Sequence, residues 1–143
     1  ADARPVTGYL ISRGPAGVQG APGDHLGIGG TATGQGRLLF YNGDALKMTL
    51  VGDTEIPAKA WHHVAMVRAG RQVTVYLNGS MLAEIEGQAE ASYPPATEQV
   101  FIGGRNDGFA NFEGRIDEVA IYDRPLSADE ITKHHAAAGA VEP

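Results

Sequence analysis

One loop of the sequence gathers the side chains best suited to contacting a ligand. Residues 105–112 read RNDGFANF and join two predicted strands. A sugar site needs such a mixture, because aromatic faces stack on C–H surfaces and amides hydrogen-bond to hydroxyl groups. The alternative is that the segment is only a turn, since Asn, Asp and Gly are residues that favour turns. The candidate ligand-binding residues are Arg105, Asn106, Asp107, Phe109 and Asn111, together with Tyr93 in the polar loop at 87–98.

A second candidate is a carboxylate placed among apolar residues. Residues 115–123 read RIDEVAIYD, and strand alternation puts Asp117 on the same face as Val119 and Ile121. A carboxylate on an apolar face is costly unless it is hydrogen-bonded or metal-bound. We therefore expect a buried Asp117 whose acceptor oxygens are satisfied, either by N–H and Arg donors or by a cation.

Catalytic groups at a usable spacing are missing from the sequence. Glycosidases need two carboxylates roughly 5–9.5 Å apart across the scissile bond. Glu113 and Asp117 share strand parity but would lie about 13 Å apart. Glu84 and Glu86 share a face that follows a hairpin and resembles a solvated surface. With no nucleophile elbow and no phosphate loop, we expect a protein that is not an enzyme.

The two histidine pairs do not predict a zinc site. His62 and His63 are neighbours on a predicted strand and point to opposite faces. His134 and His135 are neighbours on a predicted helix, where successive side chains lie about 100° apart. Neither pair can close one metal site on its own.

Composition narrows the class of partner. A length of 143 residues fits one domain with its own core. The formal net charge of −6 argues against a nucleic-acid partner, because phosphate binding needs clustered Lys and Arg. The absence of cysteine excludes disulfides, thiolate zinc sites and cysteine nucleophiles. No apolar run is long enough to span a bilayer, and no signal peptide is present in the chain as given.

Alternating apolar residues and turn signals predict an all-β chain that ends in one helix. The Asn78-Gly79 pair is the strongest hairpin signal, because type I′ turns need positive φ at both central residues. Ser127 and Glu130 form a capping box that opens a helix running to about Ala137. The predicted strands are 8–13, 25–29, 37–41, 45–51, 61–68, 72–77, 81–86, 99–104 and 115–123.

Four spaced motifs carry a family resemblance. They are W-x-H-V-A at 61–65, V-x-V-Y-L-N-G at 73–79, I-G-G-R at 102–105, and F-x-G-R-I-D-E-V-A-I-Y-D-R-x-L-S at 112–127. In this order they resemble the laminin-G-like domains of the concanavalin A-like lectin/glucanase superfamily, and the likeness runs from about Gly8 to His135. It implies an antiparallel jelly-roll β-sandwich, here with a short C-terminal helix. Trp61 and Phe112 match core positions, and His63 matches a structural one.

The same resemblance carries expectations about metal and completeness. Some members hold a structural Ca²⁺ with an aspartate in the position of Asp117; Asp107 is the other candidate ligand here. We expect the early strand that usually supplies the other calcium ligands to be missing, so the resemblance predicts a calcium role for Asp117 less strongly. We expect a single domain over 1–143, possibly an excised piece without its first strands. An open sheet edge beside 8–13 or 114–122 should then be covered by terminal segments, another copy or another piece.

The expected function is a non-catalytic recognition module of a larger extracytoplasmic protein, whether periplasmic, on the cell surface or secreted. Its partner would be a carbohydrate or a protein surface, with neighbouring domains of the parent protein and no nucleic acid or membrane insertion. The alternatives are an architectural domain packed on a catalytic neighbour and a partial glycoside hydrolase-like domain. A binding module should show a groove lined by Phe109, Tyr93, Asn106 or Asp107. An architectural module should show an exposed apolar patch.

Overall fold

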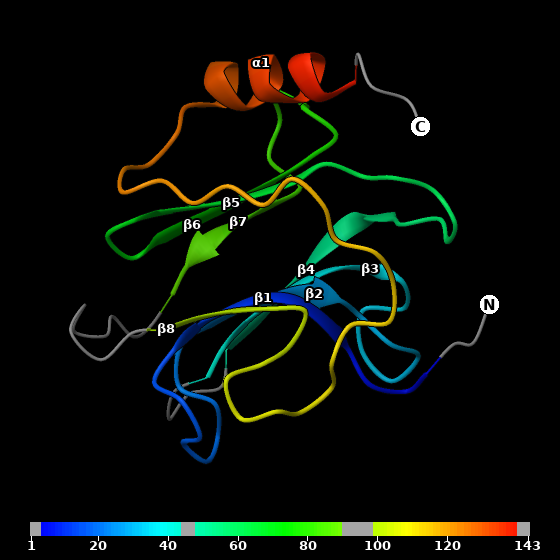
Figure 1. The fold of residues 1–143 in the computed structure, drawn as a ribbon, viewed down its shortest axis with the longest axis vertical. Helices are drawn as coiled ribbons and strands as arrows, with labels where there is room; N and C mark the ends of the chain where they lie inside the picture. Colours follow the sequence, from blue (N-terminus) through cyan, green and yellow to red (C-terminus); the bar gives the residue numbers. More distant parts are fainter. Residues whose placement is uncertain (1–3, 44–47, 90–98, 140–143) are drawn as a thin grey trace.

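The computed structural model describes residues 4–43, 48–89 and 99–139, and its two antiparallel sheets face each other (Figure 1). One sheet has the strand order β4-β3-β2-β1-β8 and the other the order β5-β6-β7. The predicted all-β sandwich with a C-terminal helix is confirmed. The elements are β1 Gly8–Gly14, β2 Asp24–Ile28, β3 Arg37–Asn42, β4 Met48–Glu55, β5 Val64–Ala69, β6 Gln72–Leu77, β7 Ile85–Gln88, β8 Gln99–Ile102 and α1 Ala128–Ala138.

Period-two alternation explains the strands that form the core. In β6, Val73, Val75 and Leu77 are buried, whereas the residues between them are half-buried. The opposing sheet contributes Leu26 of β2 and Leu38 and Phe40 of β3 to the same cluster, which Ile85 and Ala89 complete. The core therefore lies between the two sheets, where β4 of one sheet contacts β7 of the other.

The Asn78-Gly79 turn forms as predicted, but the strand after it begins late. Asn78 has a φ of 50° and Gly79 a φ of 67°, the positive values that a type I′ turn requires. The returning strand starts at Ile85 and not at Met81. Met81 and Leu82 are exposed, at 58% and 80%, because they precede the pairing with β6.

A buried ion pair joins the two sheets. Asp24 of β2 accepts a 2.7 Å hydrogen bond from Nε of Arg68 on β5, and its other oxygen accepts a 2.9 Å bond from Asn42 Nδ2. The two side chains are only 4% and 11% exposed. The stability gained from such a buried pair needs both members, since removal of one leaves the other charge buried without its counter-ion.

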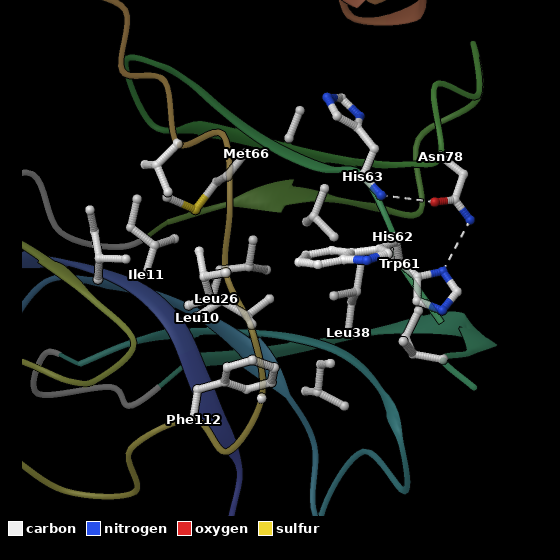
Figure 2. A pocket seen from close by; sticks show the side chains of 18 of the residues that line it. Leu10, Ile11, Leu26, Leu38, Trp61, His62, His63, Met66, Asn78 and Phe112 are labelled. Atoms are coloured by element: carbon white, nitrogen blue, oxygen red, sulfur yellow. Dashed lines mark hydrogen bonds between the residues drawn. The ribbon is translucent and has the colours of Figure 1, made fainter. Parts of the chain in front are cut away.

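Beside the core a wide groove of about 2700 Å³ lies between the sheets, and it reaches the core residues Leu26 and Leu38 (Figure 2). Apolar side chains such as Leu10, Ile11 and Met66 line it, together with Phe112. Phe112 is half-buried, so the prediction that it is a core residue holds only in part. Trp61 also lines this groove and is 53% exposed. The expectation that Trp61 is a core residue is wrong, because β5 begins only at Val64 and leaves Trp61 before the paired strand.

The predicted strand at 115–123 does not form, and the burial expected of Asp117 is wrong. Asp117 is exposed, and its Oδ1 accepts a 2.8 Å hydrogen bond from the backbone N–H of Glu118. Glu118 has a φ of 50°, which interrupts an extended strand in its middle. The apolar side chains of the segment are consequently exposed, with Val119 at 46% and Ile121 at 63%.

The expected open edge beside residues 8–13 is also absent. β1 pairs with β2 on one side and with β8 on the other, so its backbone groups are used within the sheet. In the part of the chain that the structure describes, β5 and β7 each pair with β6 alone and are the edges of the smaller sheet.

Candidate functional site: an arginine platform on the outer sheet face

Three aromatic rings form the floor of the site on the face of the five-stranded sheet opposite the core. His25 of β2 pairs in register with Tyr41 of β3, and their rings stack with centroids 5.7 Å apart. Tyr9 of β1 meets His25 edge-on at 5.9 Å. The alternation that sends Leu26 and Phe40 into the core sends His25 and Tyr41 to this outer face. Tyr9 and His25 are nevertheless buried, at 5% and 0% exposure.

Arg105 from the 103–113 loop covers this aromatic floor. Its guanidinium carbon lies 5.4 Å from the ring centroid of Tyr9 and 5.8 Å from that of Tyr41. Phe109 stacks on the guanidinium from the loop itself, at 4.6 Å. These distances are within the range of cation–π attraction. The arginine is therefore held between a buried floor and a surface aromatic ring.

Asp107 fixes the orientation of the guanidinium. Arg105 donates from Nε to Asp107 Oδ1 at 2.8 Å and from Nη2 to Oδ2 at 2.6 Å, a bidentate pair. Asp107 Oδ1 also accepts a 3.1 Å bond from the backbone N–H of Phe109. The Arg105 and Asp107 side chains are 15% and 20% exposed. We call Arg105, Asp107 and Phe109, with Tyr9 and Tyr41 beneath them, the arginine platform.

Asn106 anchors the loop and points inward. Its side-chain Nδ2 donates to the carbonyl oxygens of Pro15 and Pro22, at 2.7 and 3.0 Å. Its backbone carbonyl accepts from the N–H of Gly17 at 2.8 Å. Asn106 is 4% exposed. It therefore ties the 103–113 loop to the 15–22 loop, and its place among the candidate ligand-binding residues is that of a positioning group.

The remaining predicted ligand-binding residues lie apart from the platform surface or outside the description. Asn111 is exposed and forms an isolated parallel bridge with Tyr9, while its carbonyl accepts a 3.1 Å bond from Arg4 Nη2. Tyr93 lies outside the described residues. The structure thus brings Arg105, Asp107 and Phe109 together, with Asn106 below them and Asn111 at the base of the loop.

Burial and pairing set the charges of the platform. Desolvation raises the pKa of the Tyr9 phenol, so the ring stays neutral beneath the arginine. Desolvation also lowers the pKa of His25, which donates from Nε2 to the Ala21 carbonyl at 2.7 Å when Nε2 carries the proton. The hydrogen bonds from Arg105 lower the pKa of Asp107, which is therefore ionised at neutral pH. The platform is an ion pair on a neutral aromatic floor.

Neither aspartate proposed as a calcium ligand offers a donor set that fits the ion. Calcium takes six to eight oxygen ligands, but both oxygens of Asp107 already accept bonds from Arg105. Asp117 is exposed and bonds locally to Glu118. Within the described ranges, no three His, Asp or Glu side chains are grouped so that they could hold a metal ion. Calcium binding at these residues stays a prediction, and we derive no function through it.

The floor of the platform was missed by sequence reasoning. Tyr9, His25 and Tyr41 lie in three different predicted strands, and only the sheet order places them side by side. A partial signal was present, because each is a polar aromatic residue next to an apolar residue in a predicted strand. Pairing such residues across strands would have needed the register, which the sequence does not state.

The match to a protein-family model agrees with the fold. The family model described as the concanavalin A-like lectin/glucanases superfamily matches residues 2–132. The human adhesion G-protein coupled receptor D1 is 29% identical over 108 residues, which are 73% of this chain and 12% of the receptor. An S-layer domain-containing protein from Clostridium thermocellum is similar in structure, with a TM-score of 0.44 and 21% identity over 94% of this chain and 65% of that one. Among the described residues, no helix is both long and apolar enough to cross a membrane.

Proposed function

Since the chain belongs to the concanavalin A-like lectin/glucanases superfamily, we propose that it is a non-catalytic recognition module that binds carbohydrate on the arginine platform. In this proposal Phe109 stacks on the C–H face of a sugar ring, while the edges of Arg105 and Asp107 hydrogen-bond to its hydroxyl groups. A neutral glycan suits the site better than an acidic one, because the charge of Arg105 is already matched by Asp107 and the chain is acidic overall.

The observation that carries the proposal is the fixed position of Phe109. Its ring is 49% exposed, yet its other side rests on the guanidinium of Arg105. That guanidinium is held by two hydrogen bonds and by the aromatic floor. A ligand that stacks on a ring already held in place loses less binding energy to ordering than one that must immobilise a free side chain.

The proposal extends to where the protein acts. The human relative is an adhesion receptor by name, and this chain matches only 12% of its length. We place the module within a larger extracytoplasmic protein, on the cell surface, secreted or periplasmic, where glycans and protein surfaces are its available partners. Absence of catalysis is part of the proposal: Glu113, which shares strand parity with Asp117 in the sequence, is bonded to Arg4 at 3.0 Å.

Affinity electrophoresis on a panel of soluble neutral polysaccharides tests the proposal. Wild-type protein should be retarded by at least one of them, and Phe109→Ala should weaken the affinity read from that retardation roughly two- to twelve-fold, because a stacking contact contributes roughly 0.5–1.5 kcal/mol. Tyr122→Ala is the matched control, since Tyr122 is 48% exposed and is not part of the platform. Carbohydrate binding on the platform is wrong if no polysaccharide retards the wild type or if both variants behave alike.

A second candidate function is an architectural domain that packs on a neighbour. The apolar groove between the sheets favours it, because Trp61, Ile121 and Tyr122 are 53%, 63% and 48% exposed along its walls. Contiguous exposed apolar surface marks a contact site in most soluble proteins. Ile121→Lys, compared with Phe109→Ala, should weaken association with the adjacent domain of the parent protein; equal association of both variants would exclude this role.

A further inference from the structure

Two histidines that are far apart in sequence, His63 and His135, are in contact at one end of the three-stranded sheet. His62 and His63 precede β5, while His134 and His135 lie on α1. The rings of His63 and His135 have centroids 5.5 Å apart. Only the docking of α1 creates this contact, which joins one member of each sequence pair.

Three residues of α1 contribute to its docking beside this pair. Ile131 is fully buried, and Thr132 Oγ1 donates a 2.7 Å hydrogen bond to the Gly79 carbonyl. His135 packs directly on Gly79, where an added Cβ would lie 2.6 Å from the histidine side chain. Figure 1 shows α1 on the side of the smaller sheet that faces away from the five-stranded sheet. His135 is thus one of the residues through which α1 contacts the turn.

The neighbourhood of His63 favours a neutral ring. The backbone N–H of His63 donates to Asn78 Oδ1 at 3.0 Å (Figure 2). The backbone carbonyl of His63 accepts from the N–H of Asn78 at 2.8 Å, so the residue cannot easily move away. Its Nδ1 is buried without a hydrogen-bond partner. Desolvation lowers the pKa of His63, and His135 and His134 lower it further.

The other charged groups around the pair do not offset a second positive charge. His62 bonds to Pro57 and Asn78, and His134 stacks on Tyr122 of the 115–123 segment. The carboxylates of α1 are already paired, Asp129 with Lys133 and Glu130 with Arg124. The Asn78-Gly79 turn contributes amide and carbonyl groups only.

We propose that the His63–His135 pair is a pH-sensitive latch, which holds α1 against the Asn78-Gly79 turn at neutral pH and releases it when both rings are protonated. The sign follows from the lowered pKa of His63 in the folded protein. A histidine of this kind contributes its stability above its ordinary value of about 6.5, and the contribution is lost as the pH falls through the lower folded value. Release uncovers Ile131 and the turn beneath it.

Amide hydrogen exchange at about pH 7.5 and about pH 5.5 tests the latch, read as protection factors so that intrinsic rates cancel. Protection of the α1 amides should fall by up to about ten-fold at the lower pH, while β6 amides keep theirs, because that is the most that one histidine with an ordinary pKa of about 6.5 can contribute when its folded pKa is lowered. In His135→Gln the fall should largely disappear, whereas His62→Gln, the neighbouring control, should behave as wild type. An unchanged α1 in wild type, or the same fall in His135→Gln, overturns the proposal.

A second measurement covers the case in which His135→Gln loosens α1 at every pH. An NMR titration of the His63 ring in wild type should give a midpoint below about 6.5, and His135→Gln should raise that midpoint. A His63 midpoint that does not respond to His135→Gln shows that the two rings do not share a charge interaction, and it overturns the latch whatever the state of the helix.

Discussion

At the residue scale, the buried Asp24–Arg68 pair matters more for the stability of the folded state than any exposed ion pair. It joins β2 of one sheet to β5 of the other, and its members are 4% and 11% exposed. Exposed pairs such as Asp129–Lys133, at 64% and 73%, are screened by water and salt. The two kinds of pair have similar distances but different consequences for the folded state.

Asp24→Ala should lower the free energy of unfolding by about 3–5 kcal/mol, because Arg68 would keep a buried charge and Asn42 would lose an acceptor. Asp129→Ala should change it by less than about 0.5 kcal/mol, as an exposed i,i+4 pair. Urea unfolding of both variants measures the difference. Equal losses in the two would mean that burial of the Asp24 pair has no energetic role.

At the scale of elements, α1 is specified locally by its first turn. Ser127 Oγ accepts from Glu130 N–H at 3.2 Å, and Glu130 accepts from Ser127 N–H at 2.9 Å while also binding Arg124. The hydrogen bonds from Arg124, followed by the one from Ser127, lower the pKa of Glu130 to about 2. The contribution of this exposed group is present above its ordinary value and is lost only as the pH falls toward 2, so the cap is constant over the range in which the histidine latch responds.

Ser127→Ala should weaken α1 by about 1 kcal/mol, because the N–H of Glu130 loses its capping acceptor. Ser127→Asp should restore most of the loss, since aspartate is an equally good capping residue. The readout is the exchange protection of the α1 amides at neutral pH, compared with those of β6. Unaltered protection in Ser127→Ala would show that docking alone, without the cap, sets the stability of the helix.

At the scale of the whole molecule, the core and the arginine platform occupy opposite faces of the same sheet. Phe40 is fully buried on the inner face, whereas Phe109 is half exposed above the outer one. The fold can therefore tolerate changes in the platform that it cannot tolerate in the core. This separation is what allows the platform to be tested without unfolding the domain.

Phe40→Ala should cost about 3–5 kcal/mol, the range for emptying a large aromatic site in a packed core. Phe109→Ala should cost no more than about 1 kcal/mol, the loss of one exposed cation–π contact. Thermal or urea unfolding of the two variants gives the comparison. A large loss for Phe109→Ala would mean that the platform is a structural clamp on the sheet.

Much of the architecture could be predicted because its signals are local. Alternation located β1, β2, β3 and β6 to within about one residue, and turn chemistry identified Asn78-Gly79. The capping box located the start of α1. Such features depend on neighbours within a few residues, so the order of amino acids contains them.

Other features could not be predicted, because they depend on which segments meet. The segment RIDEVAIYD is rich in apolar residues and was predicted to be a strand, yet Glu118 adopts a positive φ and the segment makes no strand. Without that strand Asp117 is not buried. Trp61 lies in the groove because it falls outside β5, which begins at Val64.

By itself the sequence determined the all-β class, the helix with its cap, and a loop chemically able to meet a ligand. Only the tertiary structure decided that Arg105 rests on Tyr9 and Tyr41, that Asp24 meets Arg68, and that His63 meets His135. Backbone alternation and capping act over two to four residues. These side-chain encounters depend on sheet order, strand register and the docking of a helix, which bring together residues separated by tens of positions in the chain.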